Sequence, residues 1–228
     1  MTDAPPLTTP KDSPTQATRQ GSKPGARQVA RAGTARLPAA ERRRQLLQVA
    51  LETFAAKGFH DTSMNEVADN AGVTKPVLYQ HFKSKQALYR ELVDELGAQL
   101  EQEVFAAVSN ATGPRQQVEE GFRAYFRWAT AQGPAFRVLF SERNRADPAL
   151  AEAVDRVEAV VADRVAELID IEGLSESERQ VLAFGVVGIA ESTSRRWLGL
   201  GLGAGTDAEA FANQVARLAW SGLRGISP

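Results

Sequence analysis

The stretch ADNAGVTKPVLYQHFKSKQALY, Ala68–Tyr89, decides how the first part of this chain folds. Its spacing A-x-x-x-G-V-x-x-x-x-L suits a tight corner between two helices. Ala68 allows the helices to approach closely, and Gly72 allows the sharp turn between them, which we expect at positive φ. Val73 and Leu78 are expected to fill the crossing. The pattern predicts a helix-turn-helix, whose second helix can enter the major groove of DNA.

Further helices are predicted around this corner. Apolar residues recur at helical spacing before it, over AERRRQLLQVALETFAAKG, and a long helix is expected after it, over residues 84–108. Residues typical of helix ends bound these segments. They are Pro38 and Gly58 for the first helix, Ser63 and Glu66 for the second, Thr74 and Pro76 for the third, and Ser84 for the fourth.

The remainder of the chain also has the pattern of helices. The predicted spans are 114–131, 134–143, 148–170, 175–200 and 206–224, and no segment alternates with period two. The fold class is therefore all-α. Residues 38–83 form a three-helix helix-turn-helix domain, which a long helix joins to a larger helical domain over 84–228. Residues 1–37, rich in Pro, Thr, Ser, Gly and Ala, are predicted to be a disordered basic tail.

Composition excludes several classes of protein. The chain has no cysteine, which removes disulfides and thiolate sites, and its two histidines are too few for a histidine-based metal cluster. No apolar run approaches the roughly 20 residues of a membrane helix, and the polar first residues lack the apolar segment that a signal peptide would need. We expect a cytoplasmic protein with no cofactor, no metal and no membrane partner.

The charge is distributed unevenly, although the net charge is only −1. Residues 1–90 carry 14 Lys and Arg against 7 Asp and Glu, whereas residues 91–228 carry 13 against 21. A basic first part suggests a polyanionic partner at that end.

Hydrogen-bond donors gather around the corner. A recognition helix places its N-terminal residues toward the bases, and its free N–H groups also suit phosphate. The starts of the second and fourth helices offer further places for phosphate contacts. The candidate DNA contacts are Thr62, Ser63, Thr74, Lys75, Pro76, Tyr79, His81 and Lys85.

The run G-V-x-x-x-x-L-Y-x-H-F-x-x-K-x-x-L, preceded by FAAKGFHDT, resembles the DNA-binding domain of TetR-type transcriptional repressors over roughly residues 41–93. The resemblance implies a homodimer with a variable helical C-terminal domain that binds a small effector. It also implies that Thr74, Lys75, Tyr79, His81 and Lys85 occupy DNA-contacting positions. The stretches AFRVLFSERNRADPALA, VLAFGVVGIAESTSRRWL and RLAWSGL resemble actinobacterial regulators of fatty-acid synthesis that respond to long-chain acyl-CoA.

Apolar residues suggest where such an effector would bind. A stripe on the long helix and the aromatic residues of 122–140 suit an elongated apolar ligand as a group, although plain core packing is the better explanation for any one of them. The candidate effector-binding residues are Leu100, Val104, Val108, Phe122, Tyr125, Phe126, Phe136 and Phe140. Arg123, Arg127 and Arg137 could meet a phosphate or carboxylate, but solvated positions suit each of them better.

The last two helices have small-residue faces. Gly185 and Gly188 permit close helix approach, and the final helix presents alanines over 212–219. Two such helices from each subunit could form a four-helix dimer interface. Packing of the same faces within one chain is the alternative.

The sequence therefore predicts a homodimeric repressor that binds a palindromic double-stranded operator and responds to a small apolar effector, such as a long-chain acyl-CoA or fatty acid. One alternative is a regulator of drug efflux with an aromatic or cationic ligand. Another is an acyl-handling enzyme or a lipid-binding bundle. Against an enzyme, the chain has no G-x-S-x-G elbow, and neither histidine lies in the C-terminal domain.

Overall fold

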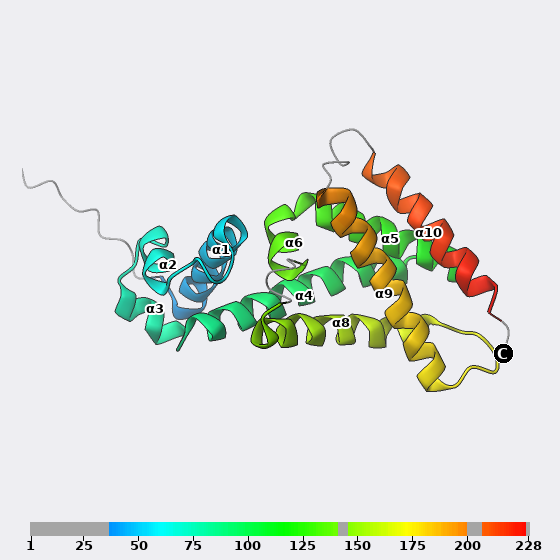
Figure 1. The fold of residues 1–228 in the computed structure, drawn as a ribbon, viewed down its shortest axis with the longest axis horizontal. Coiled ribbons are helices and arrows are strands. Elements are labelled where there is room, and N and C mark those ends of the chain that lie inside the picture. Colours follow the sequence, from blue (N-terminus) through cyan, green and yellow to red (C-terminus); the bar gives the residue numbers. More distant parts are fainter. Residues whose placement is uncertain (1–36, 141–145, 200–206, 227–228) are drawn as a thin grey trace, which may run out of the picture. The chain divides into compact units, whose positions relative to one another are not determined.

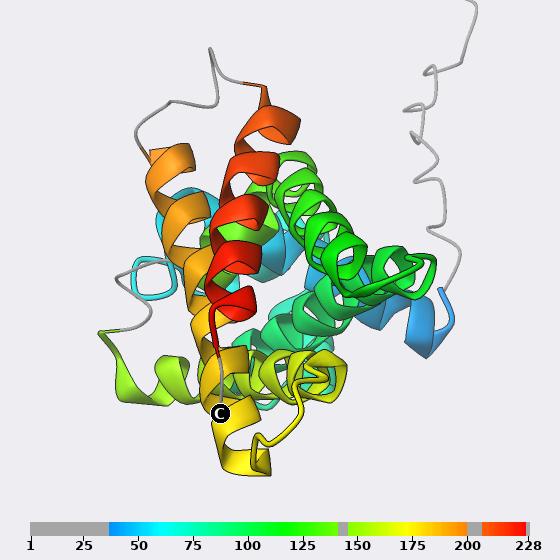
Figure 2. The same ribbon diagram turned by 90° about the vertical axis from the view of Figure 1, so that its right-hand side faces the viewer.

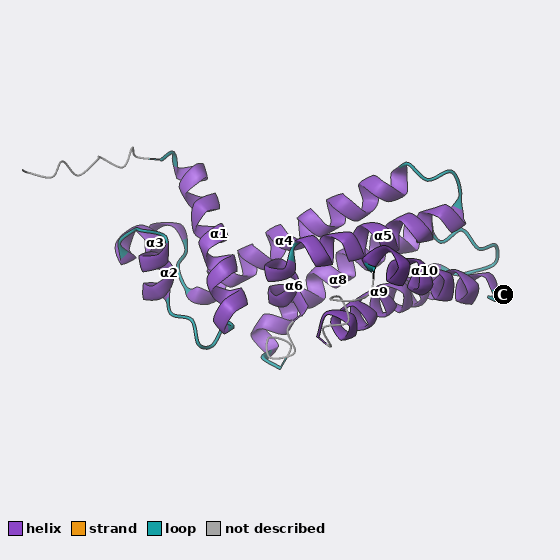
Figure 3. Ribbon diagram, turned by 90° about the horizontal axis from the view of Figure 1, so that it is seen from above, coloured by secondary structure: helices purple, strands orange, loops and turns teal. Residues whose placement is uncertain are grey.

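The computed structural model describes residues 37–140, 146–199 and 207–226. All regular elements in these ranges are α-helices (Figure 1, Figure 3). The predicted all-α fold is confirmed. The helices are α1 (Ala39–Lys57), α2 (Met64–Asn70), α3 (Lys75–His81), α4 (Lys85–Ser109), α5 (Pro114–Ala131), α6 (Gly133–Phe140), α8 (Pro148–Leu168), α9 (Glu176–Gly199) and α10 (Ala208–Arg224).

Parts of some sequence-based expectations lie outside the described residues. Of the predicted tail over 1–37, only residue 37 is described. Three predicted helical spans extend into undescribed residues at one end: 134–143, 175–200 and 206–224. Among the described helices, none combines the length and apolarity that a bilayer crossing requires.

The first three helices form the part that we call the head. Gly72 has φ +65°, as the tight corner requires, and the Val73 amide donates to the Ala68 carbonyl at 3.0 Å. Leu78 is fully buried, and Val67 lies beside it in the same core. The corner is therefore held by apolar packing of α2 and α3 against α1 and the start of α4.

The helix ends follow the expected capping pattern in part. The Ser63 and Ser84 hydroxyls accept from the amides of Glu66 at 3.2 Å and Ala87 at 3.0 Å. Thr74 occupies the N-cap position of α3, but its side chain makes no capping hydrogen bond. The extended backbone of Thr74 therefore starts α3 without a side-chain cap.

The start of α9 has a complete capping box. The Ser175 hydroxyl and amide both donate to the Glu178 carboxylate, at 2.6 and 2.8 Å, and the Glu178 amide donates back to the Ser175 hydroxyl at 3.3 Å. The hydrogen bonds that Ser175 donates to the charged carboxylate lower the pKa of Glu178, and the bond from the hydroxyl has the largest effect.

The larger domain is built around α4, which packs against α5 and α8. Figure 2 shows α10 beside α5 and α9, and α9 also packs on α8. Helices α4 and α8 approach closely at Gly97, where a Cβ atom would lie 2.6 Å from both methyl carbons of Val157. Helix α6 packs on α1 and α4, so it is a part of the larger domain that contacts the head.

A candidate nucleic-acid interface and an effector cavity

The recognition helix α3 is buried on one side only. Leu78 anchors it in the core, whereas Thr74, Lys75, Pro76 and Tyr79 are exposed, Tyr79 by 40% of its surface. The Lys75 ammonium lies 5.8 Å from the centre of the Tyr79 ring. The exposed side therefore offers hydroxyl and ammonium donors near the N-terminus of the helix, the combination that suits base edges and phosphates.

The end of α3 is held by a residue that the sequence analysis did not single out. Arg43 on α1 donates to the His81 carbonyl at 2.8 Å, forms an ion pair with Glu91 on α4, and lies 4.4 Å over the Phe82 ring. His81 itself is half-buried. Nothing in the run of arginines at 42–44 distinguishes the one that makes these contacts, because they join three separate helices.

Two of the candidate DNA contacts lie differently from the expectation. Thr62 is only 2% exposed, and its hydroxyl donates to the Gly58 carbonyl at 2.9 Å. The Lys85 ammonium donates to the carbonyls of the turn between α1 and α2. Ser63, the N-cap of α2, is exposed. The structure thus brings Ser63 and the α3 residues to the surface, while it directs the side chains of Thr62 and Lys85 into the protein.

A cavity of about 390 Å³ lies between the helices of the larger domain. Its walls are mostly apolar and come from α4, α5, α6, α8, α9 and α10. Among the eight candidate effector-binding residues, the structure brings six together around it: Leu100, Val104, Val108, Phe122, Tyr125 and Phe140.

The other two candidates pack elsewhere. Phe126 is fully buried against Trp197 and Phe211, with ring centroids 5.9 and 5.3 Å away. Phe136 packs against Phe140 at 4.8 Å and does not line the cavity. Aromatic density in the sequence does not separate the two roles, because neighbouring residues on one helix face different partners.

One cavity wall was missed from the sequence. It consists of valines on α8, and they recur every three or four residues, as an amphipathic helix requires. These residues are Val154, Val157, Val161 and Val165.

A few polar groups also line the cavity. Tyr125 contributes a hydroxyl, which lies 3.2 Å from the Ser194 hydroxyl. Glu191 is 7% exposed and pairs with Arg195 at 3.6 Å. Arg224, at the end of α10, contributes a guanidinium group.

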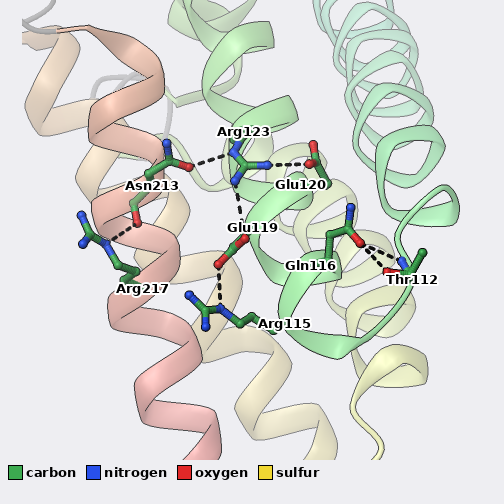
Figure 4. Close-up of polar contacts among 8 residues, drawn as sticks. All are labelled: Thr112, Arg115, Gln116, Glu119, Glu120, Arg123, Asn213 and Arg217. Atoms are coloured by element: carbon green, nitrogen blue, oxygen red, sulfur yellow. Dashed lines mark hydrogen bonds and ion pairs between the residues drawn. The ribbon is translucent and has the colours of Figure 1, made fainter.

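The other arginines considered for a ligand head group do not line the cavity. Figure 4 shows Arg123 between α5 and α10, where it donates to Asn213 at 2.8 Å and pairs with Glu119 and Glu120. Arg137 is exposed and donates to the Ala55 carbonyl at 3.3 Å, and Arg127 is also exposed. These side chains are therefore used for helix contacts or solvated. Over the described part of the chain, no group of three or more His, Asp or Glu is placed to hold a metal ion.

Comparisons with known proteins agree with this architecture. The family model described as "Bacterial regulatory proteins, tetR family" matches residues 46–92, and the model "Tetracyclin repressor-like, C-terminal domain" matches residues 114–222. The chain is 34% identical over 189 residues to the HTH-type transcriptional activator FasR of Mycolicibacterium smegmatis, a match that covers 82% of this chain and 85% of FasR.

Solved structures have the same fold. A TetR-like transcriptional regulator from Rhodococcus sp. RHA1 is 27% identical, with a TM-score of 0.67 over 84% of this chain and 100% of that chain. The regulator FadR from Bacillus subtilis, solved in complex with stearoyl-CoA, has a TM-score of 0.69 at 18% identity, over 81% of this chain and 99% of that chain. With its helix-turn-helix head and helical C-terminal domain, this chain belongs to the TetR family of transcriptional regulators and is not an enzyme.

Proposed function

We propose that the protein is a homodimeric regulator whose affinity for a palindromic operator is set by a long-chain acyl ligand in the cavity. The observation that carries this proposal is that cavity-lining residues belong to α4 and α6, the two helices that also contact the head. We place the boundary between head and effector domain at residues 83 and 84, with the tail over 1–37. Since it would bind operator DNA, we expect the protein in the cytoplasm.

An acyl ligand is supported by the chemistry of the cavity. Its walls are mainly aliphatic and aromatic, which suits a long hydrocarbon chain. Arg224 offers a cation to a carboxylate or phosphate head group. Four acidic residues also line the cavity, Glu101, Glu158, Asp170 and Glu191, and two of them, Glu101 and Glu191, are paired with Arg164 and Arg195. The solved complex of FadR with stearoyl-CoA, whose fold this chain shares, supports the same ligand class.

A dimer is supported by an apolar face on α9 and α10. Val181, Phe184 and Leu218 are 71%, 48% and 64% exposed. A Cβ atom added at Gly185 or Gly188 would meet nothing within 4 Å, so no residue described in this chain uses the space that these glycines leave. Large exposed apolar residues beside small ones suit packing against the same face of a second copy.

Control of DNA binding follows from the contacts of α6. Leu139 and Phe140 line the cavity, while the preceding Val138 carbonyl accepts from the Tyr89 hydroxyl of α4 at 3.0 Å. A ligand that prefers one position of α6 and α4 changes the distance between the two recognition helices. Those helices must lie about 34–36 Å apart to enter successive major grooves. The ligand therefore changes DNA affinity to the extent that it binds one position of α4 and α6 more tightly than the other.

The experiment combines ligand identification with DNA binding. Native mass spectrometry of the purified protein identifies a co-purifying ligand. Affinity for a duplex enriched from a random library is then measured with and without palmitoyl-CoA. We expect a two-fold symmetric operator, a steep salt dependence and a change in affinity with palmitoyl-CoA but not with free CoA. Binding that responds only to a planar aromatic cation would replace the acyl proposal with the efflux alternative.

The direction of regulation is a separate question. The sequence predicts a repressor, whereas FasR of M. smegmatis is named an activator. The same bound dimer blocks or assists transcription according to where its operator lies, so a reporter driven by the native upstream region decides between the two. We expect reporter output to rise on deletion of the gene if the protein is a repressor and to fall if it is an activator.

A further inference from the structure

We propose that Lys85 is a positioning residue for DNA binding, which holds the turn between α1 and α2 and does not neutralise a phosphate. This inference rests on the proposed function, because it concerns how the head is arranged on DNA. It reverses the assignment that the resemblance to TetR-type repressors implies for this lysine.

All three donors of the Lys85 ammonium have acceptors within the protein. The Nζ atom lies 2.8 Å from the Phe59 carbonyl oxygen, 3.3 Å from that of His60 and 2.7 Å from that of Thr62. It also lies 4.4 Å from the centre of the Phe59 ring. A lysine ammonium has three N–H groups and no more, so a phosphate contact would require it to release a carbonyl.

The turn depends on a cation at this place. Three carbonyl oxygens converge on one point, and without a positive group their dipoles would repel one another in a partly buried environment. Phe59 is fixed by ring contacts with Phe54 at 5.8 Å and Tyr89 at 5.2 Å, so the turn cannot easily move its carbonyls apart.

The same turn leads directly into α2. Thr62 is buried through its hydrogen bond to the Gly58 carbonyl, and the next residue, Ser63, is the N-cap of α2. Lys85 therefore joins the first turn of α4 to the start of α2, which packs on the recognition helix α3. Loss of Lys85 should displace the DNA-facing end of α2 rather than remove a charge from the interface.

Lys75 and Lys83 provide matched comparisons. Both are exposed, and neither ammonium has a hydrogen-bond or ion-pair partner among the described residues. They carry the same charge on the same small domain, but their donors are available to phosphate oxygens. The three lysines thus separate charge from position.

The experiment measures the salt dependence of DNA affinity for Lys85→Met, Lys75→Met and Lys83→Met. Fluorescence anisotropy is recorded on a duplex enriched from a random library by the wild-type protein. Each phosphate contact contributes about 0.9 to the log–log slope against salt. We expect Lys75→Met and Lys83→Met to lower the slope by about this amount. Lys85→Met should weaken binding about tenfold at every salt concentration with the wild-type slope, since hydrogen bonds to a charged group are lost.

Two further measurements keep the test decisive. Hydrogen exchange of the free protein should show lost protection at the amides of residues 59–66 in Lys85→Met but not in Lys75→Met or Lys83→Met. Lys85→Arg keeps the charge but cannot place three N–H groups around one point, so it should bind as weakly as Lys85→Met. If Lys85→Met does not fold, Lys85→Arg decides.

Each contrary result has its own meaning. A slope lowered by about 0.9 in Lys85→Met, or wild-type affinity in Lys85→Arg, would overturn this inference and restore Lys85 as a phosphate contact. A wild-type protein that binds no duplex in a salt-dependent way would instead overturn the proposed function. The exchange measurement then still tests whether Lys85 holds the turn.

Discussion

A methyl group added at Gly97 probes the packing of α4 against α8, on which the position of the long helix depends. In Gly97→Ala the new Cβ would lie 2.6 Å from both methyl carbons of Val157 and 3.2 Å from its Cβ. Valine is short and stiff at χ1, so its side chain cannot swing out of the way. The backbone of α4 or α8 must therefore shift.

The expected magnitude follows from two opposing effects. Replacing glycine by alanine inside a helix stabilises it by about 1 kcal/mol. Overpacking a core costs about 1–3 kcal/mol, and contact with a whole branched side chain places this site toward the upper end. We expect the free energy of unfolding of Gly97→Ala to fall by about 2 kcal/mol.

The assay is urea denaturation at one fixed protein concentration, followed by circular dichroism. Gly121→Ala on α5 is the matched control, because its Cβ would lie 3.4 Å from a Val108 methyl, an ordinary contact. This control should gain stability. The double variant Gly97→Ala/Val157→Ala removes the clash and should recover the overpacking cost of about 3 kcal/mol relative to the sum of the single variants.

DNA affinity gives a second readout of the same change. Because Val157 lines the cavity, a forced separation of α4 and α8 should alter DNA affinity in the absence of ligand and reduce the effect of palmitoyl-CoA. Gly97→Ala with stability equal to or above that of the wild type would refute the close approach of α4 and α8 and the magnitude derived from it.

Further predictions concern the dimer face, the start of α9 and the head. Gly185→Ala combined with Gly188→Ala should stabilise the isolated helix by about 1 kcal/mol per site but raise the dimer dissociation constant in analytical ultracentrifugation; an unchanged constant would place the interface elsewhere. Ser175→Ala should raise the pKa of Glu178 toward its ordinary value in an NMR titration. Since the folded pKa is lowered, the wild-type contact stabilises the protein above the ordinary glutamate pKa and loses this contribution as the pH falls through the folded value. Arg43→Met should lower the free energy of unfolding by about 1 kcal/mol, since the ion pair between Arg43 and Glu91 is partly exposed. The urea midpoint should fall accordingly, and DNA binding should weaken. An unchanged midpoint would mean that Arg43 does not hold α3.

The helices and the corner were predictable from the sequence because their signals are local. Helix ends depend on caps and glycines within a few residues, and Gly72 needs positive φ whatever surrounds it. Leu78 is buried because its spacing from Gly72 places it on the side of α3 that faces the helix crossing. Local chemistry of this kind was sufficient to place the exposed Thr74 and Tyr79 on the surface as well.

The partners of side chains far apart in the sequence were decided only by the tertiary structure. Lys85 has the charge and the donors that a phosphate contact needs, but the carbonyls of Phe59 and Thr62, which precede it by more than 20 residues, converge on its ammonium group. Phe122 and Phe126 lie on one helix, yet only Phe122 lines the cavity, because Phe126 packs against Trp197 of α9 and Phe211 of α10 instead. The sequence by itself determined where helices begin and end, since that depends on neighbours along the chain. Tertiary packing determined which of their faces meet the cavity, the core or solvent, since that depends on which helices come to lie against them.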